Sequence, residues 1–377
     1  MSNTPLKSDW TVKLGSNIVW VMPKTTPNEK DPKVTAQAAG LHYVHDTEPG
    51  ILRKKKRKGF IYVLPNGKPV SARDLKRIHS LGIPPAWTDV WICASPNGHL
   101  QVTGRDAKGR KQYLYHPLFR KFRDETKYDR MLEFAAGLPK VRRRVDKDLG
   151  QKSMSRERVL AAVLKVLEKT LIRVGNEEYV KENHHFGLTT LSNKQVEVEG
   201  STVHFHFKGK SGVWHDVEMS SLRVAKVIKK CQDLPGQELF SFRDEAGSFR
   251  SIHSHDVNDY LKELTGKDIT AKDFRTWFGS VKALQDFCKL PLARAERARK
   301  KNVVAVVGKV AAQLGNTKAV CRKSYIYPGI IETYMQGGPL EVSCKCKKGH
   351  PGLHPDEQAL VHFLERHLRK TSAALRS

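Results

Sequence analysis

The sequence predicts an α+β protein with a small β-rich N-terminal domain and a larger, mainly helical domain that holds a small β-sheet. Its 377 residues exceed what one typical hydrophobic core accommodates, which favours two domains. Strand and turn signals concentrate between residues 59 and 117, and helical patterns dominate beyond residue 120. We therefore expect a flexible arm at 1–38, a β-rich domain at 39–120 and a helical domain at 121–377 that ends in a basic extension at 340–377.

The strand-rich stretches of the first domain share one turn signal. GFIYVLPNGKPV (59–70) and DVWICASPNGHLQVTG (89–104) are apolar runs interrupted by Pro-Asn-Gly, which is typical of a β-hairpin. Between them, the helical pattern of SARDLKRIHSLGI puts Leu75, Ile78 and Leu81 on one face. The basic run RKKKRK (53–58) is interpreted as a solvated loop.

Two different periodicities predict the larger domain. Residues 155–173 carry a helical apolar stripe, made of Leu160, Val163, Leu164, Leu167 and Leu171. The stretch that follows alternates with period two, which places Val203, Phe205 and Phe207 on one face of a small sheet. Helical patterns return after Ser220, so the sheet is expected to be an insertion among helices.

The charge balance points to a polyanionic partner. There are 67 Lys and Arg residues against 39 Asp and Glu residues, a net charge of +28. Nucleic acid is the simplest partner for such an excess. A ribosome-associated protein, or one that is merely basic, would show the same charge, so the excess alone does not choose between these classes.

Cysteine usage and hydropathy bear on the compartment. The six cysteines form no regular disulfide framework, which favours a reducing cytosol. The N-terminal stretch has no apolar core, and no apolar run approaches membrane-spanning length. We expect a protein that is neither exported nor embedded in a membrane, with a cytoplasmic location.

Lys210 stands in the segment FKGKSG (207–212), which resembles part of a phosphate-binding loop. That motif also needs a glycine where this chain has His204, so the interpretation fails. What remains is a lysine at the tip of a predicted hairpin. Such a lysine is either an ordinary exposed turn residue or a mobile proton donor.

Four further polar residues have ordinary explanations when each is taken alone. Arg173 can offset the dipole at the end of a helix, and Arg275 lies one turn after Lys272 on another. Asn316 can be the N-cap of a helix that Pro328 limits, and Tyr325 can be a packing residue. Nothing in the residues around Tyr325 and Tyr327 chooses between these two tyrosines.

Taken together, two arginines, a lysine, an asparagine and a tyrosine are what phosphodiester transesterification requires. Guanidinium groups hold non-bridging oxygens and stabilise the charge of the pentavalent state. A phenol attacks phosphorus, and a lysine gives a proton to the leaving sugar oxygen. Because an unperturbed phenol has a pKa near ~10, neighbouring cations must favour the phenolate.

The chain resembles the bacterial, poxvirus-like type IB DNA topoisomerases from about Gly59 to Tyr334. The resemblance depends on several motifs in a fixed order: IPPAW (83–87), GRKQYLYH (109–116), RVGNEEY (173–179), FGLTTL (186–191), FKGKSG (207–212), TAKDFRTW (270–277) and VCRKSY (320–325). One such motif is weak evidence, whereas the full ordered set is specific.

The resemblance implies a role for each candidate catalytic residue. Arg173 and Arg275 match the two catalytic arginines, and Lys210 matches the general acid. Tyr325 matches the nucleophile, which selects it over Tyr327. The position nine residues before the nucleophile is His or Asn in the family, and here it is Asn316.

The resemblance also implies a set of DNA contacts. The GRKQYLYH segment touches the major groove in the family, which implicates Arg110, Gln112, Tyr113 and Tyr115, and a further contact matches Tyr179. Poxvirus enzymes carry Lys where this chain has Asn176. Because base contacts set specificity, this difference speaks against the poxvirus pentanucleotide preference.

The implied activity is the relaxation of supercoiled double-stranded DNA. Tyr325 would form a 3′-phosphotyrosyl bond, the free strand would swivel, and the 5′-hydroxyl would reseal the break. The energy of the phosphodiester is kept in the covalent link, so neither ATP, a metal nor a small-molecule cofactor is implied. The resemblance further implies a monomer, associated with the nucleoid, that closes as a C-shaped clamp and whose catalytic fold is related to the tyrosine recombinases.

Two other functions would explain part of these features. A tyrosine recombinase or integrase shares much of the residue set but typically has His-x-x-Arg where this chain has Lys272-Asp-Phe-Arg275. A non-enzymatic basic nucleic-acid-binding protein explains the charge but not the ordered residue set.

A zinc site was also weighed for the C-terminal segment. Cys344, Cys346, His350 and His354 are soft ligands close together, but Cys-x-Cys is not the usual zinc spacing. We therefore expect no metal site there. The stretch DEQALVHFLERHLRK that follows is predicted to be an amphipathic helix.

Overall fold

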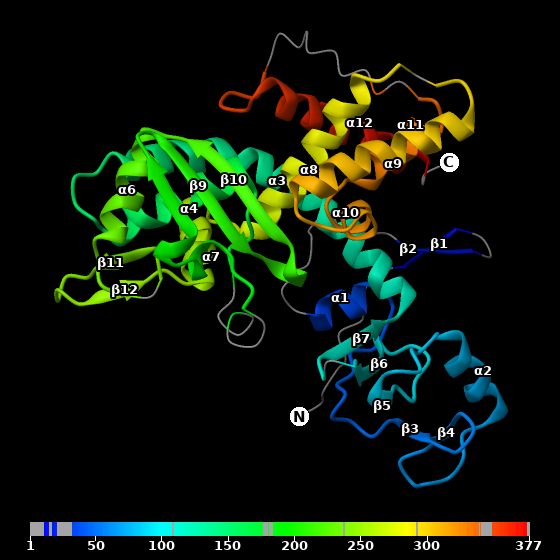
Figure 1. The fold of residues 1–377 in the computed structure, drawn as a ribbon. Helices are drawn as coiled ribbons and strands as arrows, with labels where there is room; N and C mark the ends of the chain where they lie inside the picture. The colour runs from blue at the N-terminus through cyan, green and yellow to red at the C-terminus, as the bar shows by residue number, and fades with distance from the viewer. Residues whose placement is uncertain are drawn as a thin grey trace, which may run out of the picture. The chain divides into compact units, whose positions relative to one another are not determined.

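The computed structural model describes residues 11–14, 17–20, 32–107, 109–175, 180, 184–236, 238–291, 293–338, 340 and 349–374. The chain divides into two compact units, Met1–Lys127 and Tyr128–Ser377. Small sheets and many helices make it an α+β protein, as predicted (Figure 1). None of the helices within those ranges is both long enough and apolar enough to span a membrane.

A five-stranded antiparallel sheet is the framework of the first unit. Its strand order is β4-β3-β5-β6-β7, and every neighbouring pair is antiparallel. The strands and the helix that covers them are β3 (Ile51–Lys55), β4 (Phe60–Val63), α2 (Ala72–Ser80), β5 (Thr88–Ile92), β6 (Leu100–Arg105) and β7 (Lys111–Tyr115). The core between sheet and helix consists of Ile51, Ile78, Val90, Ile92 and Val102.

The two Pro-Asn-Gly turns behave differently. The second connects β5 to β6 as an antiparallel pair, which confirms the predicted hairpin. The first follows β4, but only one isolated bridge, from Val63 to Pro69, forms after it. A proline has no N–H to donate to a ladder, so the pairing goes no further at that point.

Two expectations for the first unit are corrected by its packing. Leu75 was expected on the core face of α2, yet its exposed fraction is 36%, because the core reaches only Ile78 and Leu81 in the second half of the helix. The basic run begins inside β3 and is not entirely a loop. Arg53 donates to the carbonyls of Pro84 (3.1 Å) and Trp87 (2.5 Å), which gives its charge polar partners at the sheet.

Residues before the sheet also form regular structure. Strands β1 (Thr11–Leu14) and β2 (Asn17–Trp20) pair in antiparallel fashion, and α1 (Pro32–Ala38) follows. Ala36 is fully buried in a small cluster with Leu41 and Phe119. Residues 32–38, which we expected within a flexible arm, are therefore a packed helix.

Helix α4 (Arg156–Thr170) forms the centre of the second unit. Every residue from Val159 to Leu164 has an exposed fraction of 2% or less, so the middle of the helix is surrounded by protein. It contacts α6, α7, α8 and β10 (Figure 1). The predicted stripe is buried, and Leu171 ends the helix in the left-handed conformation with φ of 57°.

The predicted small sheet is present in the second unit. Strands β8 (Val196–Glu199), β9 (Thr202–Lys208) and β10 (Trp214–Ser220) pair antiparallel in the order β10-β9-β8. Val203, Phe205 and Phe207 are buried on one face, as their alternation predicted. A second hairpin, β11 (Ser241–Arg243) with β12 (Phe249–Ser251), was not predicted.

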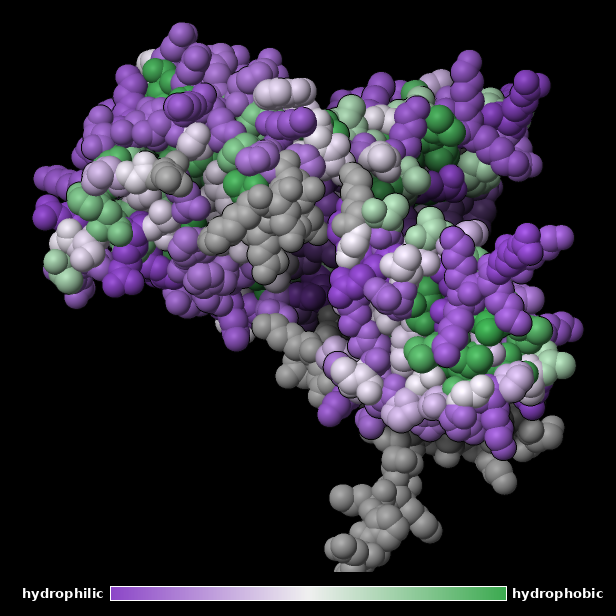
Figure 2. Space-filling view, turned by 60° about the horizontal axis from the view of Figure 1, so that its bottom comes forward, coloured by the Kyte–Doolittle hydropathy of each residue, from purple (hydrophilic) through white to green (hydrophobic). Residues whose placement is uncertain are grey.

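The remaining α-helices complete the second unit, and the first of them, α3, begins in the first unit. They are α3 (Pro117–Leu149), α6 (Leu222–Gln232), α7 (Ser254–Thr265), α8 (Ala271–Cys288), α9 (Glu296–Gln313), α10 (Lys318–Ser324), α11 (Pro328–Met335) and α12 (Pro355–Ala374). Hydrophilic residues cover most of the described surface on the face drawn in Figure 2, in keeping with the charge of +28.

The C-terminal helix α12 is part of the core. Leu360 and Leu364 are fully buried. Arg142 of α3 donates to both carboxylate oxygens of Glu357, over 2.8 and 2.7 Å, and to Glu168 over 2.7 Å. The predicted helix is thus confirmed, and within the segment expected as a basic extension it is packed against the rest of the unit.

Candidate active site

Tyr325 lies at the end of helix α10. The helix starts after Thr317, whose Oγ1 accepts a hydrogen bond from the Val320 N–H (3.3 Å), so the N-cap is not Asn316. Tyr325 is the C-cap residue, and its N–H donates to the Cys321 carbonyl over 3.0 Å. Its side chain is half-buried, so the phenol belongs neither to the core nor to the open surface.

Tyr327 lies in different surroundings from Tyr325. Pro328 does not limit one helix but starts the next, α11, with Tyr327 as its N-cap. The Tyr327 ring is buried against α12, with ring centroids 6.2 Å from Phe363 and 5.5 Å from His367. The Tyr327 ring therefore packs against the C-terminal helix.

Helix α8 holds the backbone around Tyr325. The fully buried Ser280 accepts from the Tyr327 N–H (2.9 Å) and donates to the Tyr325 carbonyl (3.3 Å). A Cβ on Gly279 would lie 2.7 Å from that carbonyl oxygen, so only glycine allows the approach. The only signal in the sequence was a Gly-Ser pair flanked by the apolar residues Phe278 and Val281.

Arg275 extends from the first turns of α8 toward the tyrosine. Its guanidinium, with an exposed side-chain fraction of 3%, donates to the carbonyls of Leu171 and Leu314, the latter over 2.6 Å. Its Cζ lies 5.2 Å from the centre of the Tyr325 ring. Burial, together with the neighbouring charge of Arg173, lowers the pKa of Arg275 to about 10.

Arg173 and Asn316 meet beside Arg275. Arg173 donates to the Gly315 carbonyl over 3.2 Å and to Oδ1 of Asn316. Since guanidinium can only donate, this contact identifies the amide oxygen and leaves Nδ2 as the donor. That Nδ2 is buried and has no hydrogen-bond partner among the described residues. The amide is thus oriented with an unused donor at the cluster.

The pKa of the Tyr325 phenol is lowered. Burial raises it, but the charge of Arg275 and its hydrogen bond to the phenol lower it, and Arg173 and Lys272 add to that effect. The net direction favours the phenolate, which is the form that attacks phosphorus. Lys272, which lies one turn before Arg275, thus also lowers the pKa of the phenol.

Lys210 lies on the turn between β9 and β10. The turn spans Lys210–Gly212 and is closed by hydrogen bonds between Gly209 and Val213, over 2.8 Å, and Gly212 and Gly209, over 3.0 Å. Ser211 has a φ of 65°, which is unusual for a residue other than glycine. Lys210 is exposed at this tip.

Two family models and several viral relatives match this chain. Residues 116–336 match the family described as "Eukaryotic DNA topoisomerase I, catalytic core", and residues 59–106 match "Bacterial DNA topoisomerase IB, N-terminal domain". The DNA topoisomerase 1B of Acanthamoeba polyphaga mimivirus is 32% identical over 293 residues, covering 76% of this chain and 87% of the relative. The chain belongs to the type IB DNA topoisomerase family. The DNA topoisomerase 1B of vaccinia virus (strain Copenhagen) is 27% identical over 249 residues, which are 65% of this chain and 76% of the relative.

Within this topoisomerase, the predicted DNA-contacting residues of the first unit lie on and beside β7. Asp106 accepts hydrogen bonds from Arg110 (2.9 and 2.7 Å) and from Gln112 (2.9 Å), so one carboxylate holds both side chains. Tyr113 is 46% exposed and stacks on Tyr115, with centroids 6.2 Å apart. Sequence reasoning had missed Asp106.

Some predicted residues of the topoisomerase lie outside the described residues. They are Tyr179, Asn176 and the two cysteines of the candidate zinc site, Cys344 and Cys346. Of the remaining candidate ligands, His350 lies beside His362 of α12, with ring centroids 5.7 Å apart. The described residues contain no group of three or more ligands that could hold a metal.

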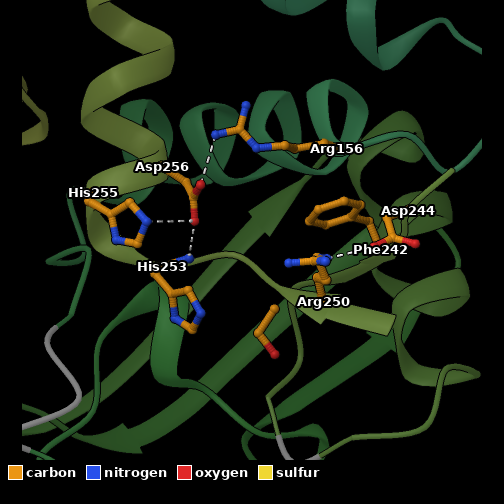
Figure 3. Close-up of a pocket in the computed structure, with 8 residues that line it drawn as sticks. Arg156, Phe242, Asp244, Arg250, His253, His255 and Asp256 are labelled. Atoms are coloured by element: carbon orange, nitrogen blue, oxygen red, sulfur yellow. Dashed lines mark hydrogen bonds and ion pairs between the residues drawn. The ribbon is translucent and has the colours of Figure 1, made fainter. Parts of the chain in front are cut away.

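A separate cavity of about 440 Å³ lies where β11 and β12 meet α4 and α7 (Figure 3). Arg156 pairs with Asp256 (2.7 Å) and Arg250 pairs with Asp244 (2.6 Å), so both arginines already face a carboxylate. None of its lining residues is a predicted site residue of the topoisomerase. The candidate active site is therefore the cluster around Tyr325 and not this cavity.

Proposed function

We propose that Tyr325 cleaves one strand of duplex DNA by attacking a phosphodiester. Its proton leaves to water, the Oη–phosphorus bond forms and the phosphorus–O5′ bond breaks, which yields a 3′-phosphotyrosyl link and a 5′-hydroxyl. The observation that carries this proposal is the position of the Tyr325 ring 5.2 Å from the buried Arg275 guanidinium, whose charge lowers the pKa of the phenol. Swivelling of the cut strand and the reverse attack by the 5′-hydroxyl then relax the DNA.

Arg173, Arg275 and Asn316 are proposed to bind the non-bridging oxygens of the scissile phosphate. The proposal is supported by the hydrogen bond from Arg173 to Asn316 and by the unused Nδ2 donor of Asn316. Arg173 lies close enough to the buried Arg275 for its charge to disfavour the charge of Arg275. A phosphate placed between them would relieve that repulsion and gain charge-assisted hydrogen bonds.

Lys210 is proposed to protonate the O5′ leaving group. An alkoxide is a poor leaving group, so a proton donor at this oxygen lowers the barrier. The support is the position of Lys210 at an exposed turn of the β9–β10 hairpin. The next residue in this turn, Ser211, has the left-handed backbone conformation.

The first unit is proposed to bind the major groove through Arg110, Gln112, Tyr113 and Tyr115, with Tyr179 as a further contact.

We propose that the two units act as a clamp around the duplex and that one chain suffices, because all five catalytic candidates belong to it. We further propose that it acts on the nucleoid in the cytoplasm and that its catalytic fold is related to the tyrosine recombinases.

Plasmid relaxation in EDTA tests the proposed reaction. Supercoiled plasmid is expected to relax without ATP or added divalent metal, because the cluster supplies positive charge from arginines and the covalent link conserves the bond energy. The measurement is gel electrophoresis of topoisomers over time, with an EDTA-inhibited restriction nuclease as the control for chelation. Strict dependence on magnesium or ATP would contradict the mechanism. A product with exchanged strands between two duplexes would favour the recombinase alternative.

Replacing Asp106 with asparagine tests the proposed groove contact. An amide oxygen still accepts one hydrogen bond, but the charged pair with Arg110 is lost, so Arg110 and Gln112 become less ordered. We expect DNA affinity to change by less than about tenfold, since this ion pair is exposed, while the ranking of cleavage sites along a duplex changes. Mapping covalent adducts on one DNA fragment, with Asp89→Asn as the control, measures this. An unchanged cleavage pattern would contradict the role.

A further inference from the structure

His215 connects the turn that carries Lys210 to the loop that carries Asn316. It is the second residue of β10, it pairs with Phe207 across the hairpin, and its ring stacks on the Phe207 ring. The ring centroids are 4.9 Å apart and the planes differ by 10°. The imidazole therefore has a fixed orientation, given by a buried aromatic neighbour.

Two glycines lie directly against the His215 ring. A Cβ on Gly209 would be 2.6 Å from the ring's Cδ2, and a Cβ on Gly315 would be 2.4 Å from its Cε1. Real Cβ atoms essentially never approach so closely, so both positions need glycine for the ring to fit. One imidazole thus fills the space between two backbone segments that are distant in sequence.

Each of these glycines immediately precedes a candidate catalytic residue. Gly209 precedes Lys210, and Gly315 precedes Asn316. The Gly315 carbonyl also accepts the hydrogen bond from Arg173. A shift of the ring would therefore move the backbone next to the proton donor and the backbone next to the phosphate-binding groups.

The electrostatics favour a neutral ring. Burial lowers the pKa of His215, and the charges of Arg173 and Arg275 lower it further. A neutral imidazole can pack against the two backbones without adding a third positive charge beside the arginines. Its contacts are those of a spacer, and we assign it no proton transfer.

We propose that His215 is a positioning residue that holds the Lys210 turn against the Arg173–Asn316 loop. The inference rests on the proposed role of Lys210 as the general acid. It predicts that loss of His215 impairs protonation of the leaving oxygen more than it impairs attack by Tyr325. No motif in the sequence singles out His215.

A leaving group that needs no proton separates these two effects. In a duplex with sulfur in place of the bridging O5′ at a mapped cleavage site, the leaving thiolate is far less basic than an alkoxide. General acid catalysis typically increases a reaction rate about 10²–10⁴-fold. A misplaced acid should therefore slow cleavage of the oxygen substrate strongly and hardly affect cleavage of the sulfur substrate.

The experiment compares His215→Ala, His215→Gln and Lys210→Ala on oxygen and sulfur substrates in single-turnover cleavage. We expect His215→Ala to cleave the oxygen substrate at least about tenfold more slowly and the sulfur substrate at close to the wild-type rate. A variant with both His215→Ala and Lys210→Ala should cleave the oxygen substrate no more slowly than Lys210→Ala alone. Asn316→Ala is the matched control, since it should slow both substrates.

The outcomes separate this inference from the function on which it rests. If sulfur rescues Lys210→Ala but not the His215 variants, the positioning role is wrong while the general acid stands. If sulfur fails to rescue Lys210→Ala, the proposed acid itself is wrong. If His215→Ala does not fold, as judged by its thermal unfolding, His215→Gln gives the same test with a smaller loss of volume.

Discussion

Replacing Tyr325 with phenylalanine is expected to abolish DNA cleavage and plasmid relaxation. The substitution removes the only oxygen of that side chain, while the ring can still pack beside the Arg275 guanidinium, 5.2 Å from its centre. Without the nucleophile no covalent intermediate forms, so the loss should be complete and not a fold-change. The measurement is denaturant trapping of the protein–DNA adduct, together with relaxation in EDTA.

Tyr327→Phe is the matched control for this result. Tyr327 is buried against Phe363 and His367 of α12, and its N–H is already held by Ser280. Losing its hydroxyl should cost at most about 1–2 kcal/mol of stability and leave adduct formation intact. Adducts from Tyr325→Phe, or none from Tyr327→Phe in a folded protein, would mean that the other tyrosine is the nucleophile.

Replacing Arg275 with lysine is expected to lower the cleavage rate by roughly 10²–10³-fold, as the loss of a preorganised donor does at other charge-stabilising sites. Arg275 uses two nitrogens to hold the carbonyls of Leu171 and Leu314, and its plane lies near the Tyr325 ring. A lysine retains one charge but cannot reproduce this planar fork. Single-turnover cleavage of a duplex measures the effect.

The pH dependence of the Arg275→Lys variant gives a second readout. In the wild type, the hydrogen bond from Arg275 helps to lower the pKa of Tyr325. Losing that bond raises the pKa, so the rise of the cleavage rate with pH should move to higher pH. Arg156→Lys is a suitable control, because Arg156 pairs with Asp256 at the separate cavity. Equal losses in both variants would point to general destabilisation.

The long amphipathic elements were predictable because their burial follows local periodicity. Leu160 and Leu167 of α4 and Phe205 of β9 are buried where the 3.6- and 2-residue patterns put them. Leu75 was misplaced because periodicity gives a face but not the extent of the surface that covers it. Arg53 was misplaced because its partners, the carbonyls of Pro84 and Trp87, are more than thirty residues away in the chain.

The motifs and their order in the chain were sufficient for the fold class, the family and the five catalytic candidates, since these depend on residue identity and spacing. The contacts that give Tyr325 and Tyr327 different surroundings, and that orient the groups around Tyr325, depend on the three-dimensional fold. Ser280 holds the backbone at Tyr325 and Tyr327, and the ring of His215 fills the space between Gly209 and Gly315. These contacts join segments tens of residues apart, and close packing decides them, which no local pattern records.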